Sequence, residues 1–267
     1  LGLITVGCVL LITVYLIISG IPAIQKIGLV PFLTGKVWSS TSAEPKYGIL
    51  PFILTSVYGT AGAIVLGVPI GFLTAVYLSK VAPKKVRTVL EAAVSLLAGI
   101  PSVVYGLVGM LVLVPAIRKT FHLPDGASLF AAIIVLAVMI LPTMTTLSVD
   151  GLRAVPDGYR QGSLALGYTR WQTIWHVVLK SAMPSLMTAV ILGMTRAFGE
   201  TLAVRMVIGG IEAMPTSLLS PASTITTTLT TSMAVYAEGS AQDDVLWALG
   251  LLLMGMSPVS YTHLRAH

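Results

Sequence analysis

The chain has 267 residues, of which 55% are hydrophobic and only 10% are charged, and its mean hydropathy is +0.92. Soluble domains carry roughly 25% charged residues, so this composition excludes a soluble globular protein and indicates a membrane protein. The net charge of +6 does not indicate nucleic-acid binding, because membrane proteins are usually basic in their cytoplasmic loops. The single cysteine, Cys8, excludes a disulfide within the chain and a cysteine-based metal site.

Apolar segments long enough to cross a bilayer recur along the chain. A hydrocarbon core needs about 20 apolar residues per helix, which predicts an all-α, polytopic membrane protein with about six transmembrane helices. The last of these begins at Val245. The other predicted spans lie near residues 1–20, 49–78, 90–116, 128–149 and 185–209.

The predicted spans divide the chain into three parts. Residues 1–48 are expected to form the first transmembrane helix and a periplasmic segment, and residues 49–256 the main transmembrane domain. The first segment has neither the basic start nor the small-residue cleavage site of a signal peptide. After Met256, polar residues arrive too early for a complete span, so we expect both chain ends to be truncated and residues 257–267 to be a non-native tail. A short interfacial C-terminus is the alternative.

Basic residues predict the orientation in the membrane. The segment between the second and third spans carries Lys80, Lys84, Lys85 and Arg87, and the segment between the fourth and fifth spans is also basic. Residues 210–242 contain no lysine or arginine. By the positive-inside rule, the basic segments and the N-terminus are cytoplasmic.

The third predicted span is interrupted by Gly99 and Pro101, which are followed by Ser102 and Tyr105. A broken helix at this place would expose backbone groups and hydroxyls to a permeating anion. Close helix packing explains the glycines equally well.

The segment of about residues 151–184 is the longest polar stretch on the predicted inner side. Its apolar positions have helical spacing, with Trp171 and Trp175 on one face and a break at Gly167 and Tyr168. Two short helices joined by a glycine turn would present an apolar, aromatic surface to a cytoplasmic partner. The alternative is an ordinary amphipathic helix at the membrane interface.

The fifth predicted span contains the string TRAFGET, with Arg196 and Glu200 four residues apart. A charged side chain at the centre of a membrane helix costs roughly 2.5–3.5 kcal/mol, so both should face the interior of the bundle or a wet cavity. Residues four apart lie on one helical face, which predicts a mutual ion pair. Arg196 then offers a planar fork of donors to an oxyanion, and Glu200 competes for these donors when the anion leaves. The alternative is an ion pair that only orients helices.

Two parts of the chain resemble known transport proteins. The segment around Gly167 is similar to the loop of ABC importer permeases that docks on the ATPase subunit, whose pattern is Glu-Ala-Ala, three residues, Gly, nine residues, Ile-x-Leu-Pro. Val177 and Leu179 match this pattern, whereas Lys180 replaces the proline. Gln161, Gly162 and Ser163 stand in place of Glu-Ala-Ala. The literal Glu-Ala-Ala at Glu91 lacks the following glycine and Leu-Pro spacing.

A wider resemblance covers most of residues 58–209. The strings AGIPSVVYG and RAFGET, in this order, resemble the PstC-type permease subunits of bacterial phosphate importers. This resemblance implies a type I importer fold in the bacterial inner membrane. It also implies three partners: a PstA-type permease, a pair of cytoplasmic ATPase subunits, and a periplasmic phosphate-binding protein.

The resemblance and the residue patterns together give the candidate functional residues. The expected substrate pathway contains Arg196, Glu200, Thr201, Ser102 and Tyr105. The expected ATPase-coupling residues are Gln161, Gly162, Ser163, Gly167, Tyr168 and Trp171.

No phosphate-binding loop of the pattern GxxxxGK[ST] occurs in the sequence. The chain is therefore expected to be a transport subunit with no cofactor of its own, and ATP and Mg²⁺ would bind the partner ATPase. Three alternatives remain: a permease for sulfate or molybdate, a secondary transporter that needs no ATPase, and an intramembrane enzyme using Glu200 and His176. The predicted topology opposes the enzyme, because His176 is cytoplasmic and Glu200 lies within a span.

Overall fold

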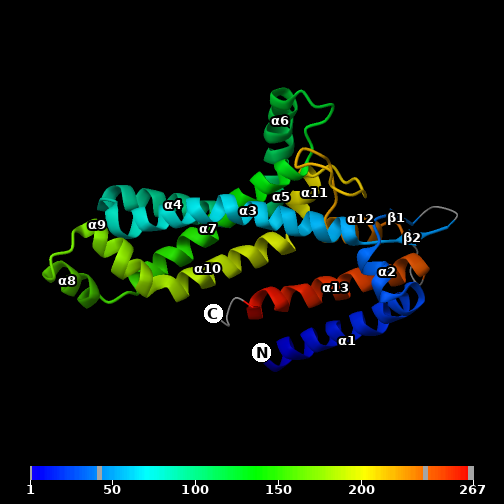
Figure 1. Cartoon of the computed structure of the whole chain (residues 1–267), viewed down its shortest axis with the longest axis horizontal. Helices are drawn as coiled ribbons and strands as arrows, with labels where there is room; N and C mark the ends of the chain where they lie inside the picture. The colour runs from blue at the N-terminus through cyan, green and yellow to red at the C-terminus, as the bar shows by residue number, and fades with distance from the viewer. Residues whose placement is uncertain (1, 41–43, 237–239, 264–267) are drawn as a thin grey trace. The chain divides into compact units, whose positions relative to one another are not determined.

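The computed structural model describes residues 2–40, 44–236 and 240–263, and most of them are helical (Figure 1). Within these residues, five helical segments are long and apolar enough to cross a membrane. Helices are expected here because every backbone polar group within a bilayer must find its partner inside the protein. The predicted all-α, polytopic fold is confirmed. The five segments are Gly2–Ile27, Leu50–Val81, Ser102–Phe121, Leu129–Arg153 and Arg170–Gly199.

The chain forms two compact units, and three helices have at least three residues in each of them. The first unit comprises Leu1–Gly59, Gly106–Ala132 and Gly199–His267, and the second comprises Thr60–Tyr105 and Ile133–Phe198. The shared helices are α3 (Leu50–Val76), α5 (Ser102–Val108) and α7 (Leu129–Arg153).

In the first unit, helices α1 (Gly2–Ile27) and α13 (Ala241–His263) lie side by side (Figure 1). A Cβ atom at Gly20 would lie 3.0 Å from the backbone of Ala248, so glycine permits this close approach. At one end of the pair, Lys26 and Asp244 form an ion pair at 3.6 Å. The remaining elements of this unit are α2 (Leu29–Thr34), β1 (Trp38–Ser39), β2 (Lys46–Tyr47), η2 (Gly109–Leu113), α6 (Val114–Phe121), α11 (Leu202–Val207) and α12 (Ile225–Met233).

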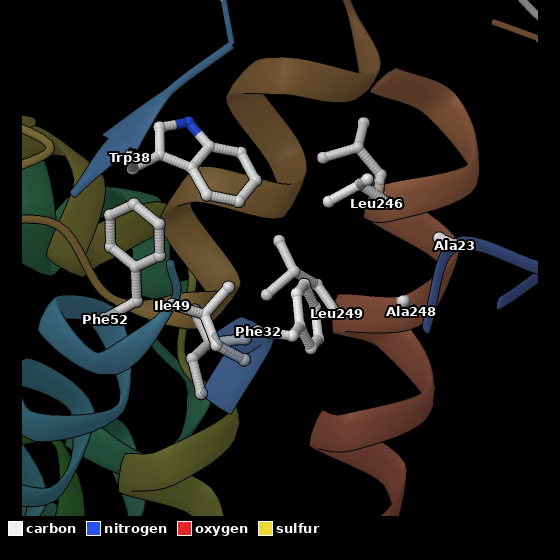
Figure 2. Close-up of a cluster of buried hydrophobic side chains, with 10 residues drawn as sticks. Ala23, Phe32, Trp38, Ile49, Phe52, Leu246, Ala248 and Leu249 are labelled. Carbon is white, nitrogen blue, oxygen red and sulfur yellow. The ribbon is translucent and has the colours of Figure 1, made fainter. Parts of the chain in front are cut away.

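The core of the first unit gathers aromatic and aliphatic side chains from several elements (Figure 2). Strands β1 and β2 pair antiparallel, and Trp38 of β1 packs edge-on against Phe52 with ring centroids 5.3 Å apart. Figure 2 also shows Leu249 of α13 beside Phe32 of α2. Burial of this apolar cluster holds the short β-hairpin and α2 against the last helix.

The second unit contains most of the functional residues predicted from the sequence, but not Glu200 and Thr201. Its core joins the end of α3 to the end of α7 and the start of α10, through residues that include Leu78, Leu152 and Leu186. Besides parts of the shared helices, its elements are η1 (Tyr77–Val81), α4 (Lys84–Gly99), α8 (Asp157–Ala165), α9 (Arg170–Thr173), η3 (Ile174–Val178) and α10 (Leu179–Gly199).

Three predicted span boundaries are wrong. The predicted span 90–116 is two helices, because α4 ends at Gly99 and the membrane-length segment begins only at Ser102. The predicted span 185–209 begins earlier, at Arg170, and ends at Gly199. Helix α13 continues through the expected break after Met256 and reaches His263. Whether residues 257–267 are native stays a prediction, and residues 264–267 lie outside the described chain.

Candidate functional site

Helix α8 and the continuous helix formed by α9 and η3 make a helical hairpin. We call this hairpin, residues 157–178, the coupling loop. The chain reverses at Gly167, whose φ of +87° lies in the left-handed region. This conformation costs an L-residue roughly 1–2 kcal/mol, so glycine is required for the turn. The turn is closed by Tyr168, whose backbone N–H donates to the Ser163 carbonyl at 3.2 Å. The predicted break at Gly167 and Tyr168 is confirmed.

Side-chain hydrogen bonds hold the coupling loop in one shape. The buried hydroxyls of Ser163 in α8 and Thr173 in α9 lie 3.0 Å apart and form a hydrogen bond. Helix α9 begins with a capping box, in which Thr169 and Gln172 each accept from the other's backbone N–H. Ser163, which the sequence places among residues facing the ATPase, therefore lies inside the hairpin and joins its two helices.

The outer surface of the coupling loop is aromatic and apolar. Leu166 is 83% exposed, Trp171 58% and Tyr168 44%. The rings of Trp171 and Trp175 meet edge-on at 5.7 Å, and Trp175 in turn contacts Phe72 of α3 at 6.4 Å. The exposed apolar surface is thus connected to a membrane-length helix through a chain of edge-on and tilted ring contacts. Gln161, Gly162 and Gly167 are also exposed.

Arg196 lies near the end of α10 and is half-buried. Its Nη1 donates a hydrogen bond of 2.8 Å to the Thr143 hydroxyl of α7. A guanidinium carries five N–H donors, and the Thr143 bond occupies only one of them.

The predicted ion pair of Arg196 and Glu200 on one helical face is wrong, because α10 ends at Gly199. Glu200 lies in the break before α11, where its carboxylate accepts a hydrogen bond of 3.1 Å from the Ala203 N–H. Its backbone carbonyl accepts one from the Thr226 hydroxyl, also at 3.1 Å. A carboxylate at a helix start satisfies free N–H groups. Glu200 therefore stabilises the broken helix in this structure.

The break in the third predicted span is confirmed, and Tyr105 bridges it. Helix α4 ends at Gly99, α5 begins at Ser102, and the Tyr105 hydroxyl donates 2.7 Å to the Leu97 carbonyl. The same carbonyl also accepts from the Ile100 N–H at 3.2 Å, so the Tyr105 bond adds a second donor at the end of α4. Thr201 precedes α11, and its hydroxyl donates a hydrogen bond of 3.4 Å to the Gly199 carbonyl.

The candidate pathway residues belong to two compact units. Arg196, Ser102 and Tyr105 lie in the second unit, whereas Glu200 and Thr201 lie in the first. The sequence interpretation missed Thr143 as the partner of Arg196, because the two residues are 53 positions apart and no spacing rule relates them. The hydroxyl-rich string PTMTT at residues 142–146 was the one available signal, because hydroxyls inside a span can serve as polar partners.

Comparison with known proteins agrees with this architecture. Residues 67–260 match the family described as binding-protein-dependent transport system inner membrane component. The probable ABC transporter permease protein YqgH of Bacillus subtilis is 45% identical over 258 residues, which cover 96% of this chain and 84% of YqgH. The phosphate transport system permease protein PstC of Mesorhizobium japonicum is 35% identical, covering 83% of this chain and 73% of PstC.

Solved structures show the same fold at lower identity. The inward-facing MetNI methionine ABC transporter matches with a TM-score of 0.63 at 20% identity, covering 82% of this chain and 95% of the matched chain. A bacterial alginate ABC transporter matches with a TM-score of 0.63 at 15% identity, covering 93% and 85%. With the matched residues and the helical architecture, these similarities show that the chain belongs to the family of inner membrane components of binding-protein-dependent transport systems.

Proposed function

We propose that this chain is the permease subunit of an ATP-driven phosphate importer and forms half of its transmembrane pathway. The observation that carries the substrate assignment is the similarity to several PstC phosphate permeases, such as that of Haemophilus influenzae, 32% identical over 91% of this chain. The half-buried Arg196 supports it, because a charged group within a span is a functional candidate by default. Its free donors suit the oxygens of a phosphate ion.

The coupling loop is proposed to dock on a cytoplasmic ATPase. Its surface combines exposed apolar and aromatic side chains with internal hydrogen bonds that hold its shape, as recognition by a partner groove requires. A pre-shaped loop loses little conformational freedom on docking. The basic residues Arg160 and Arg170 within it favour a cytoplasmic position and, with the other basic segments, a cytoplasmic N-terminus in the bacterial inner membrane.

The remaining partners follow from this proposal. A PstA-type permease would complete the pathway, and a periplasmic phosphate-binding protein would deliver the ion. ATP and Mg²⁺ would bind the ATPase pair, and membrane lipid would surround the exposed apolar faces such as that of α1. Because the binding protein supplies most of the selectivity, Arg196 needs only to hold the delivered anion weakly and release it.

The test is uptake of labelled phosphate by the complete importer, with excess sulfate as competitor. In the wild type, excess sulfate should not inhibit phosphate uptake. In Arg196→Gln, uptake should fall by at least about a hundredfold, because the loss of one preorganised donor typically has an effect of this size. Arg118→Gln removes an exposed arginine of α6 and serves as the matched control, with uptake unchanged.

Three results would change the proposal. Equal inhibition by sulfate would assign the chain to another oxyanion importer. Uptake that persists without the ATPase gene, with the proton gradient intact, would indicate a secondary transporter. Normal uptake by an assembled Arg196→Gln complex would make Arg196 a structural partner of Thr143.

A further inference from the structure

An ion pair joins helix α4 to the last turn of helix α7. The carboxylate of Glu91 accepts a hydrogen bond from the Arg153 guanidinium. Their side chains are 37% and 41% exposed, and an ion pair this accessible to water contributes little to stability. Its importance therefore lies in the two elements that it connects.

The pair connects a loosely packed helix to the start of the coupling loop. Helix α4 has no fully buried side chain among the described residues, and the Glu91–Arg153 bond is the one side-chain hydrogen bond found there between α4 and α7. Arg153 is the last residue of α7, and only residues 154–156 separate it from α8. At its other end, α4 leads to the break that Tyr105 bridges. One ion pair thus lies between the coupling loop and the helix that reaches the candidate pathway.

Arg153 has a second acceptor within reach. Asp150 lies three residues earlier on α7, and side chains three apart on a helix are neighbours. The Asp150 carboxylate makes no hydrogen bond or ion pair within the described chain. It lines, together with Glu91 and Arg153, a cavity of about 160 Å³ in the second unit. The cavity leaves space for the guanidinium to exchange one carboxylate for the other.

The charges around this cavity do not suit the transported ion. Two carboxylates face one guanidinium, so an additional anion would meet net negative charge. The hydroxyls of Ser95 and Thr146 also line it and can satisfy whichever carboxylate Arg153 leaves. The arrangement fits a change of partner by Arg153 better than an oxyanion subsite.

We propose that Arg153 is a positioning residue that alternates between Glu91 and Asp150 during transport. Bonded to Glu91, it clamps α4 to the base of the coupling loop. Bonded to Asp150, it releases α4, which can then move with the broken helix that follows. This inference rests on the proposed docking of the coupling loop on an ATPase. It makes the Arg153 contact the link between movement of that loop and movement at the pathway.

The test uses the complete importer in phospholipid vesicles, with ATP hydrolysis and labelled phosphate uptake measured in the same preparation. Glu91→Gln leaves Asp150 as the stronger acceptor for Arg153. The ATP consumed per phosphate should then rise about two- to fivefold, because an exposed ion pair shifts the balance between the two bonded states by about this factor. Asp150→Asn should hold Arg153 on Glu91, so maximal uptake slows while the ratio of ATP to phosphate stays normal. Lys85→Gln, which alters an exposed charge of α4 away from the pair, is the matched control.

A charge exchange separates this mechanism from simple loss of structure. In Glu91→Arg with Arg153→Glu, both acceptors for the new arginine lie on α7, so α4 is clamped but not released. The ratio of ATP to phosphate should return to normal while uptake remains slow. A normal ratio in Glu91→Gln, or an exchanged variant as uncoupled as Glu91→Gln, would overturn the proposal.

Failure of the substrate assignment is distinguishable from failure of this inference. Basal ATP hydrolysis without phosphate should also rise in Glu91→Gln, and this readout does not depend on which anion is transported. A wild-type complex that moves another oxyanion, with basal hydrolysis raised in Glu91→Gln, would reject phosphate and support the role of Arg153. Unchanged basal hydrolysis in Glu91→Gln would reject that role.

Discussion

At the scale of single residues, the charged side chains near the end of α10 act through neutral partners. Arg196 is held by the Thr143 hydroxyl, and Glu200 accepts a hydrogen bond from a backbone N–H. A hydroxyl partner orients a guanidinium without neutralising it, so its charge remains available to an anion. This differs from a direct ion pair, in which the anion would have to displace a carboxylate of full charge.

Thr143→Ala should therefore impair transport although Arg196 is still present. Loss of a hydrogen bond to a charged group costs roughly 1.5 kcal/mol at the lower end, which predicts about a tenfold decrease in phosphate uptake. Thr143→Ser retains the hydroxyl and should restore most of the activity. Initial rates of uptake by the two assembled variants test this. Equal rates in Thr143→Ala and the wild type would show that the 2.8 Å bond does not orient Arg196 for transport.

At the scale of elements, the coupling loop depends on the turn between α8 and α9. A Cβ at Gly167 has open space around it, so the objection to a larger residue is conformational and not steric. Its positive φ fixes the direction in which α9 leaves the turn, and with it the orientation of Trp171. A relaxed turn would keep both helices and lose their relative orientation.

Gly167→Ala should uncouple ATP hydrolysis from uptake. The left-handed turn would be destabilised by roughly 1–2 kcal/mol, which favours a hairpin of different shape. Gly158→Ala, at an exposed and uncrowded position inside α8, should leave coupling unchanged and strengthen the helix by about 0.5–1 kcal/mol. The measurement is ATP hydrolysed per phosphate transported in vesicles. Equal ratios in the two variants would count against the docking role of the turn.

Much of this architecture could be predicted from the sequence, and the errors have a common cause. The lengths of the apolar segments predicted where the spans lie. Gly167 predicted the turn between α8 and α9, because glycine tolerates a positive φ. The helix end at Gly199 carries no proline, and it depends on hydrogen bonds made by Glu200 to Ala203 and Thr226. Such breaks are decided by partners that only the folded chain brings together. For the same reason, the contact of Arg196 with Thr143 and that of Arg153 with Glu91 could not be found by spacing.

At the scale of the whole molecule, the distribution of basic residues predicts one orientation. Lys85 in α4 lies in a basic segment, whereas Leu218 lies in the segment of residues 210–242 without lysine or arginine. In a chain with Cys8→Ser, an impermeant thiol reagent applied outside should label Leu218→Cys and leave Lys85→Cys unlabelled until the membrane is opened. The opposite pattern would invert the topology and place the coupling loop outside the cell.

The contact between α1 and α13 has a consequence for biosynthesis. Ala23 and Gly20 are the buried positions of α1, and the Ala248 backbone against which Gly20 packs belongs to α13, more than 200 residues later. At about 5–20 residues per second, the ribosome finishes α13 on the order of ten to fifty seconds after it has finished α1. During that interval the face of α1 that contains Gly20 has no α13 to pack against, and this contact can form only after α13 has been made.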